Sequence, residues 1–378
     1  MGVRSLNEEQ EKIVDVAAQI CDEQFAETAF TWGGKTPWEN LETLSERGFY
    51  CLAIPEKYGG GGMSIFEDTL LIEEVASVCP DTGWQVLVTT IAPHSVVQFG
   101  SEEAKERYLP PICSGERQMS IGISEPEAGS DAMNMKTTLE NDGDEYLLTG
   151  EKTWVGGVGD SNAAVIWSKM PDGNIGSVIM DFDANGVDLI TEYENMAGYT
   201  QTHFSMDRVR IPEENILITN QTEWKDQLQR LNWERVTIAM WTNALARCAI
   251  EHALEYAQTR EQFGQKIGEF QGMRWKFADM VKEYEVGRSL IYQIAATAAE
   301  NDDVPDRLKS SIAKLYAAET TERIVSESLQ VFGAKGYQKG HPLEYLYRYN
   351  RSRRIGHGTD EIMKNGIADQ LFKHGLPK

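Results

Sequence analysis

The stretch LNWERVTIAMWTNALARC, residues 231–248, has the pattern of a buried α-helix that carries one acid. At spacings of three and four, one face of this helix presents Leu231, Glu234, Ile238, Trp241, Leu245 and Cys248. Five of the six are apolar, so we expect this face to be buried. Burying an unpaired carboxylate is costly, and Arg235 points about 100° away around the helix. Glu234 is therefore either a carboxylate at the rim of the core, held by a distant cation, or a catalytic base in an apolar cavity.

Length and composition indicate a folded protein with more than one layer. The 378 residues are 41% apolar and 25% charged, and so long a chain favours two or three packed layers or domains. No apolar run approaches the roughly 18 residues of a membrane span. Charged residues from Arg4 to Asp15 argue against a signal peptide. The formal charge of −23 argues against nucleic acid or an anionic membrane as a partner.

The cysteines indicate a reducing compartment. They are odd in number and contain no CxxC pair: Cys21, Cys51, Cys79, Cys113 and Cys248. This spacing is typical of reduced core residues, so we expect a cytoplasmic protein without disulfides. The sequence also predicts no metal site.

The first third of the chain reads as helical. Asn7 and Gln10 resemble a capping box, and a helix should follow up to about Cys21. Further helices are expected at Trp38–Arg47, Phe66–Val78 and Trp84–Phe99, and at Glu102–Leu109 before Pro110 and Pro111. Four glycines at 59–62 leave two readings open, a phosphate cradle or a plain loop, and the absence of a GxGxxG or Lys-Ser/Thr pattern favours the loop.

The character of the sequence changes near Gly115. Short strands are expected at Tyr146–Leu148, Ala164–Ser168, Ser177–Asp181 and His203–Arg210, with turns at 141–143 and 171–173. Long helices follow at Leu228–Thr259, Glu269–Asn301 and Asp306–Val331, with a last helical segment after Gly358. We therefore expect an α+β protein with an N-terminal helical domain (1–117), a middle antiparallel β domain (118–222) and a C-terminal helical bundle (223–378).

Four separated stretches together resemble the acyl-CoA dehydrogenase family. They are ISEPEAGSD (123–131), GEKTWV (150–155), YAQTREQFGQ (256–265), and LQVFG (329–333) with RIGHGTDEI (354–362). They are similar to the family patterns [TS]EPxAGSD, GxKxWI, YxxxRxQFG, and QxxGGxG with RIYEGTxEI. Each stretch is weak alone, but all four occur in the family's order. The resemblance implies a cytoplasmic homotetramer that binds FAD and an acyl-CoA, oxidises the Cα–Cβ bond and passes electrons to an electron-transferring flavoprotein, as in fatty acid or amino acid catabolism.

The resemblance also implies roles for individual residues. Trp154 matches the tryptophan beside the flavin ring, although an ordinary strand core residue is the alternative. Arg260 and Phe263 match positions that reach the FAD of a neighbouring subunit, and an arginine fork suits a pyrophosphate. The full set of expected cofactor contacts is Ser124, Ser130, Trp154, Arg260, Phe263, Gln330, Gly333, Thr359 and Glu361. The expected substrate contacts are Arg235, Gly356 and His357.

The base is displaced from the family's usual position. The usual glutamate precedes the Gly-Thr of YEGT, where this chain has His357. The branch that includes the isovaleryl-CoA dehydrogenases instead places its base in a helix, within an ER pair that matches Glu234-Arg235. That branch also has glycine at the position of Gly356, which would widen the acyl cavity. The resemblance thus implies that Glu234 takes the Cα proton, while the backbone N–H at His357 polarises the thioester carbonyl. The His357 side chain is a second acid/base group, a substrate contact or a spectator.

Other departures concern the flavin site. Val155-Gly156-Gly157 stands where the family commonly has Ile-Thr-Asn, so the threonine hydroxyl that meets the flavin is missing. Ala334 replaces a glycine, and Gly198-Tyr199-Thr200 replaces the usual Gly-x-Arg. Residues 248–251 with 260–264 also resemble the crotonobetainyl-CoA reductases. The alternatives are therefore an enoyl-CoA reductase, a non-catalytic subunit of a heteromeric enzyme, or a flavin oxidase of small nitro- or amino-compounds.

Overall fold

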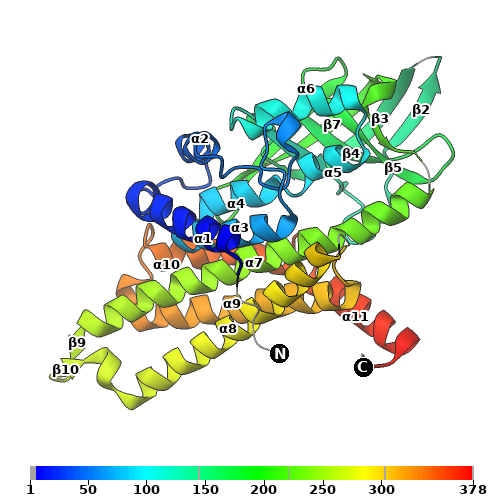
Figure 1. The fold of residues 1–378 in the computed structure, drawn as a ribbon. Helices are drawn as coiled ribbons and strands as arrows, with labels where there is room; N and C mark the ends of the chain where they lie inside the picture. Colours follow the sequence, from blue (N-terminus) through cyan, green and yellow to red (C-terminus); the bar gives the residue numbers. More distant parts are fainter. Residues whose placement is uncertain (1–5, 144, 220, 302–303, 377–378) are drawn as a thin grey trace. The chain divides into compact units, whose positions relative to one another are not determined.

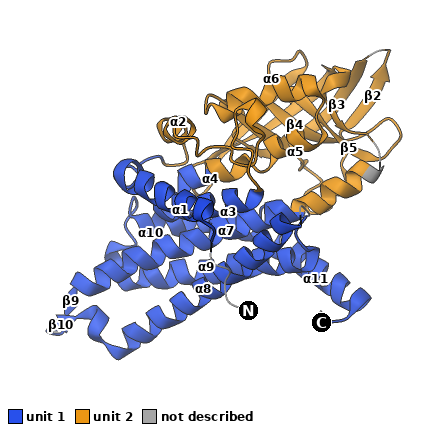
Figure 2. Cartoon of the chain, viewed as in Figure 1, with its two compact units in different colours: residues 1–32, 65–84, 232–378 blue, residues 33–64, 85–231 orange. Residues whose placement is uncertain are grey.

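The computed structural model describes residues 6–143, 145–219, 221–301 and 304–376. The described chain divides into two compact units, which are coloured separately in Figure 2. Unit 1 contains residues 1–32, 65–84 and 232–378, and unit 2 contains residues 33–64 and 85–231. Two helices cross this division, α4 (Pro80–Val88) and α7 (Gln221–Thr259). Each unit therefore draws on segments that lie far apart in the sequence.

Unit 1 is helical (Figure 1). Besides parts of α4 and α7 it contains α1 (Glu8–Ile20), α3 (Ile65–Val78), α8 (Gln271–Glu300), α9 (Arg307–Phe332), α10 (Pro342–Arg351) and α11 (Asp360–His374). A capping box of Asn7 and Gln10 starts α1, as predicted, and one π-helical turn, Cys21–Phe25, follows it. A two-stranded hairpin of β9 (Glu261–Gln262) and β10 (Gln265–Lys266) follows α7. A 3₁₀ turn, Ser352–Arg354, ends α10.

The central helix of unit 1 is α7. Its predicted face is buried at Glu234, Ile238, Trp241, Leu245 and Cys248, whereas Leu231 is half-buried. Hydrogen bonds also join this helix to its neighbours. The Thr321 hydroxyl of α9 donates to the Thr242 carbonyl (3.1 Å), and the Asn243 amide donates to the Tyr284 carbonyl of α8 (3.3 Å). These bonds and the apolar packing bury the helix on several sides.

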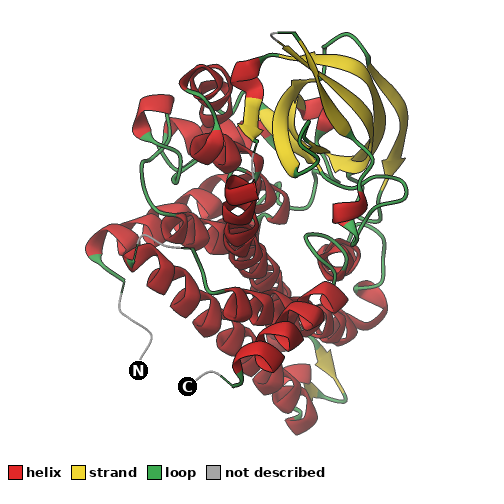
Figure 3. Ribbon diagram, turned by 90° about the vertical axis from the view of Figure 1, so that its right-hand side faces the viewer, coloured by secondary structure: helices red, strands yellow, loops and turns green. Residues whose placement is uncertain are grey.

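Unit 2 contains an eight-stranded sheet that curves strongly (Figure 3). Its strands are β1 (Gln118–Gly122), β2 (Thr138–Asp142), β3 (Glu145–Gly156), β4 (Ser161–Lys169), β5 (Ile175–Asp181), β6 (Val187–Glu194), β7 (Thr200–Ile211) and β8 (Ile216–Ile218). Their order is β6-β7-β3-β2-β4-β5-β8, and β1 pairs with β4. The sheet packs on an apolar cluster that includes Leu148, Ile166, Phe204 and Val209. Unit 2 also holds α2 (Trp38–Glu46), α5 (Ala92–Phe99) and α6 (Glu102–Cys113).

The structure differs from the predicted elements in several places. The helix expected over Trp84–Phe99 is two helices, because the chain turns at 89–91 before Pro93, which has no N–H to donate. Pro110 and Pro111 do not end α6, which continues to Cys113. Burial of Ile112 and Cys113 outweighs the lost donors near the end of the helix.

The predicted sheet differs in its pairing. Most strand pairs are antiparallel, but β1 and β4 run parallel, and β2 meets β4 in one parallel pair. The sheet is therefore mixed. Strand β6 was not predicted, although Val187, Leu189 and Tyr193 alternate with polar residues along most of it, and most of its side chains are exposed.

Two general features follow from the described residues. All five cysteines are free and buried, as expected. None of the described helices combines the length and the apolar character that a membrane crossing needs.

Candidate active site

The acid of α7 lies beside a histidine in unit 1. Glu234 is 8% exposed, and its Oε2 atom lies 3.9 Å from Nδ1 of His357. This separation is too long for a hydrogen bond, so the imidazole lies near the carboxylate without fixing it. Burial lowers the pKa of His357 below its ordinary value, although the nearby carboxylate acts in the opposite direction. The histidine is therefore biased toward its neutral form.

Aromatic rings lie on the histidine side of this pair. Trp84 meets Trp241 edge-to-face at 5.4 Å and His357 at 6.0 Å between ring centroids. The indole N–H of Trp241 donates to the Pro80 carbonyl (3.1 Å), which fixes that ring. The guanidinium of Arg353, 8% exposed, lies over the rings of Trp84 and Trp241 at 4.6 and 5.0 Å. His357 thus packs against an aromatic ring and lies close to a buried cation.

Within the described part of the chain, Arg235 forms no ion pair with Glu234. Its Nη1 atom donates to the Asn232 side chain (2.8 Å). Burial lowers the pKa of Arg235 and the positive charge of Arg307 acts in the same direction, whereas the Glu234 carboxylate opposes this shift. These contacts agree with the helix geometry, in which Arg235 points about 100° away from Glu234.

The loop after α10 has unusual backbone geometry. His357 has φ 55° and Gly358 has φ 87°, so two successive residues lie in the left-handed region. Thr359 then caps α11, because its hydroxyl accepts from the Ile362 N–H (3.3 Å). A Cβ on Gly356 would meet only the Ser352 carbonyl, at 3.6 Å, so this glycine leaves open space. Gly356, His357 and Thr359, all predicted site residues, therefore lie on one short loop, and His357 brings that loop to Glu234.

In unit 2 a buried ion pair holds the loop that contains Ser124. The Lys152 ammonium, fully buried, donates to Glu125 (2.9 Å) and to the Ile123 carbonyl (3.1 Å). Glu125 also accepts from the hydroxyl and the N–H of Thr137, at 2.5 and 2.9 Å. The Ser124 carbonyl accepts from the Thr153 N–H (2.9 Å), so this loop is tied to β3.

Trp154 is not a core residue. Trp154 is 55% exposed. Its φ is 61°, and it lies where the pairing of β3 with β7 shifts in register. The indole lies against the Tyr193 ring at 4.9 Å between centroids. Ser130, in the loop that follows Ser124, is also exposed. Unit 2 therefore presents an exposed aromatic face and a tethered serine loop.

The other predicted cofactor contacts gather at the far end of α7. Tyr256 stacks on Phe332 at 4.2 Å, which brings the hairpin of Arg260 and Phe263 to the end of α9, where Gln330 and Gly333 lie. Phe263 is 95% exposed. Arg260 follows Glu234 by 26 residues, or roughly 39 Å at the rise of an α-helix. Arg260 and Glu234 of one chain therefore cannot contact the same reacting atoms.

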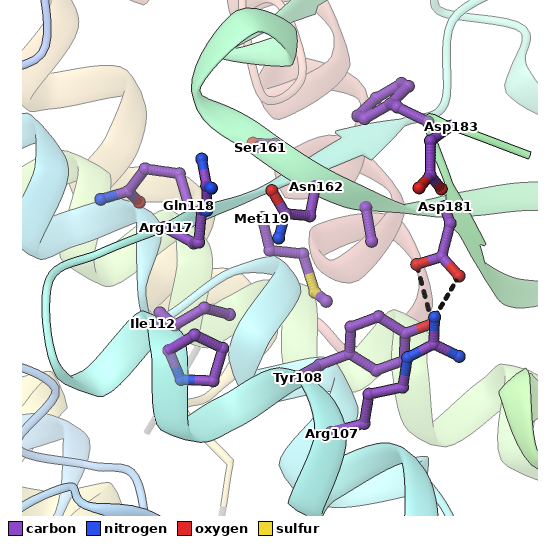
Figure 4. Close-up of a pocket in the computed structure, with 13 residues that line it drawn as sticks. Arg107, Tyr108, Ile112, Arg117, Gln118, Met119, Ser161, Asn162, Asp181 and Asp183 are labelled. Carbon is purple, nitrogen blue, oxygen red and sulfur yellow. Dashed lines mark hydrogen bonds and ion pairs between the residues drawn. The ribbon is translucent and has the colours of Figure 1, made fainter.

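A cavity of about 370 Å³ lies elsewhere in unit 2 (Figure 4). Its lining includes Arg107, Tyr108 and Asp181, in which the arginine donates to the aspartate (2.7 Å) and the tyrosine hydroxyl donates to it (3.0 Å). These polar groups are satisfied by one another. None of the predicted site residues lines this cavity.

Comparison with known protein families identifies the family of this chain. Three family models match in order: the acyl-CoA dehydrogenase N-terminal domain at residues 7–116, the middle domain at 120–209 and the C-terminal domain at 224–372. The chain belongs to the acyl-CoA dehydrogenase family. Members of this family are flavoprotein oxidoreductases that dehydrogenate or reduce acyl-CoA thioesters.

Relatives within the family have different names. A probable acyl-CoA dehydrogenase of Bacillus subtilis, YngJ, is 31% identical over 97% of this chain and 99% of its own length. The CarC subunit of the caffeyl-CoA reductase–Etf complex of Acetobacterium woodii is 31% identical over 90% and 91%. The solved butyryl-CoA dehydrogenase of Megasphaera elsdenii aligns with TM-score 0.90 and 25% identity over 98% and 100%.

The site residues fit the cofactor that family members bind. An exposed indole offers a flat apolar face, and the tethered serine loop offers hydroxyl and backbone donors. The exposed Arg260 and the N-terminus of α11 at Thr359 suit phosphate groups. Glu361 lies exposed in the first turn of that helix.

Sequence reasoning missed three buried cations, which are Lys152 of unit 2 and Lys314 and Arg353 of unit 1. For Lys314 a signal exists, because it shares a helix face with Ala317, Ala318 and Thr321. Glu234 was found from the same signal, which is a single charged residue on a helix face of otherwise apolar or small residues.

Proposed function

We propose that this chain binds FAD and catalyses the α,β-dehydrogenation of an acyl-CoA thioester, with Glu234 as the base. The observation that supports this most is the buried carboxylate on an apolar face of α7, beside a left-handed loop. Ser124, Ser130, Trp154, Thr359 and Glu361 would contact the flavin. Arg260, Phe263, Gln330 and Gly333 would serve the FAD of a neighbouring subunit. When bound, FAD supplies the acceptor of the Cβ hydride.

The protein residues act on the proton and on the carbonyl. The Glu234 carboxylate takes the Cα proton, and its burial limits the access of water to the forming carbanion. The His357 N–H donates to the thioester oxygen and stabilises the charge that develops there. Among the described residues no backbone carbonyl accepts from that N–H, which leaves it available to a ligand. Arg235, Gly356 and the His357 side chain would line the substrate site, and Gly356 leaves space for a branched acyl group.

The partners and assembly follow from the same proposal. We infer that an electron-transferring flavoprotein takes the electrons and that the enzyme is a homotetramer, as is typical of the family. We also infer the three-domain division at residues 117 and 222. The CarC relative, a reductase subunit by name, supports the reverse direction as a second candidate. In that direction Glu234 would return a proton to Cα.

The test compares Glu234→Gln with wild type and with Glu255→Gln, which makes the same change at an exposed position of α7. Butyryl-, isovaleryl- and glutaryl-CoA are mixed with each protein without oxygen, and loss of the oxidised-flavin absorbance is followed. Loss of a general base typically costs 10²–10⁴-fold, so we expect Glu234→Gln to bind flavin but to be reduced at least about 100-fold more slowly. Reduction of this variant at the wild-type rate would remove Glu234 from the mechanism.

The direction and the subunit alternative have separate measurements. Enoyl-CoA esters are added to the photoreduced enzyme, and return of the flavin absorbance at a higher rate than dehydrogenation would favour the reductase. A chain that is purified without flavin, and that gains it only with a second polypeptide, would contradict the proposal in favour of the non-catalytic subunit.

A further inference from the structure

Lys314 is a buried lysine that the proposed chemistry does not use. It lies in α9 and is 1% exposed. Its ammonium donates to the Gly358 carbonyl at 2.6 Å and lies 3.9 Å from Oδ1 of Asp360. Burial of an ammonium is costly unless it gains strong partners. The role of Lys314 should therefore lie in the groups to which its ammonium binds.

Lys314 holds the loop that carries the left-handed backbone. Its acceptor is the carbonyl of Gly358, which directly follows His357, and both residues have positive φ. A residue with a side chain adopts this region at a cost of about 1 kcal/mol or more, so the conformation at His357 depends on what surrounds it.

The same loop is held from its other side. The Arg354 Nε atom donates to Oδ2 of Asp360 at 2.6 Å, and its Nη1 atom donates to Glu322 of α9 at 2.5 Å. Asp360 is 2% exposed and follows the Thr359 cap of α11. The loop is thus clamped to α9 by Glu322 through Arg354 and by Lys314 directly.

We propose that Lys314 is a positioning residue of the reaction. By holding the Gly358 carbonyl it keeps His357 in the left-handed conformation, which directs the His357 N–H toward the thioester oxygen beside Glu234. This inference rests on the proposed function. Lys314 itself touches neither substrate nor cofactor in this role.

The charge of Lys314 is less important than its donor capacity. Burial lowers the pKa of Lys314 to about 8, although Asp360 opposes this effect. An amine donates to a carbonyl in its charged and in its neutral form. The hydrogen bond to Gly358 is therefore kept on both sides of this pKa.

The experiment replaces Lys314 by methionine, which keeps the length of the stem and removes the donor. The matched control is Lys309→Met, the same change at an exposed position of α9. Two measurements are made on the flavin-bound proteins: amide hydrogen exchange over residues 352–362, and flavin reduction by the acyl-CoA of the panel that reduces wild type fastest. If Lys314→Met alone does not fold, Lys314→Met with Asp360→Asn removes both buried charges.

In Lys314→Met the amide hydrogens of residues 352–362 should exchange faster than in wild type. The limiting rate of flavin reduction should fall by about 10- to 100-fold. The half-saturating acyl-CoA concentration of this variant should stay within about 3-fold, because the donor acts mainly in the transition state. Unchanged exchange, or faster exchange with an unchanged limiting rate, would overturn the inference. Failure of all three esters to reduce wild-type flavin would contradict the proposed function, and the exchange result would still decide whether Lys314 holds the loop.

Discussion

The backbone and the side chain of His357 have different proposed roles. Its φ of 55° orients an N–H, and its imidazole lies 3.9 Å from the Glu234 carboxylate. Because the proposed oxyanion donor is a backbone group, it persists with any side chain that tolerates the left-handed region. Asparagine tolerates this region well, whereas a β-branched residue does not.

We therefore expect His357→Asn to keep flavin reduction within about 10-fold of wild type, and His357→Val to lose at least about 100-fold. Limiting rates of flavin reduction are measured for both variants with equal flavin content. A loss in His357→Asn as large as that in His357→Val would show that the imidazole itself takes part in the chemistry.

His94 gives unit 2 a dependence on pH. Burial lowers the pKa of His94 to about 4, and the positive charge of Arg230 acts in the same direction. The unfolded chain binds a proton near pH 6.5, but the folded chain does so only near pH 4. Stability should therefore fall as the pH drops through this window, by at most about 3 kcal/mol.

The measurement is the urea midpoint from pH 7 to pH 4, a range that runs from above the unfolded pKa of about 6.5 down to the folded pKa of about 4. His94→Gln should flatten the acid side of the stability curve, and His374→Gln, at an exposed position, should not. Equal slopes for His94→Gln and wild type would mean that the acid sensitivity comes from other groups.

At the scale of elements, the loop before α2 depends on close contact with the turn between β6 and β7. A Cβ on Gly34 would lie 2.3 Å from the carbonyl carbon of Gly198, whereas a Cβ on Gly33 would meet nothing within 4 Å. Both Gly33 and Gly34 have positive φ, 59° and 84°, so alanine is strained at each. The pair thus separates backbone strain from packing.

Gly33→Ala should cost about 1 kcal/mol of unfolding free energy through strain alone. Gly34→Ala should cost about 1–3 kcal/mol more, because its methyl group must displace backbone atoms. Chemical denaturation measures the two variants side by side. Equal losses would show that the Gly34–Gly198 approach is not rigid in solution.

At the scale of the whole molecule, the length of α7 keeps the proposed base, Glu234, far from Arg260. About 39 Å lie between Glu234 and Arg260 along this helix, so we infer that Arg260 would serve the flavin site of a second copy of the chain. The exposed Phe263 beside Arg260 is consistent with a surface that is covered on assembly. This agrees with the tetramer that is typical of the family.

Light scattering should give four times the 42.5 kDa chain mass. Co-expressed Glu234→Gln and Arg260→Ala subunits should reduce flavin faster than either variant alone, because a hybrid contains intact base and intact arginine at one site. The control is the double variant in a single chain, which offers no such site. Hybrids no more active than their parents would place Arg260 outside the neighbouring FAD site.

The sequence determined the order of the domains, the helix that carries Glu234 and the residues that resemble the family. Those features depend on local periodicity and on short motifs, which a chain carries in one dimension. The capping box at Asn7 and the buried face of α7 were predicted correctly for this reason. The continuation of α6 through Pro110 was not, because burial of residues after the prolines decides it.

Only the tertiary structure decided which charges are buried together. His357 meets Glu234 across 123 residues of sequence, and Lys314 reaches the Gly358 carbonyl across 44. The left-handed φ of Trp154 and the exposure of its ring likewise depend on how β3 pairs with β7. The sequence names the groups that carry charge or polarity, but their free energy depends on which side chains and dipoles surround them, and only folding sets those distances.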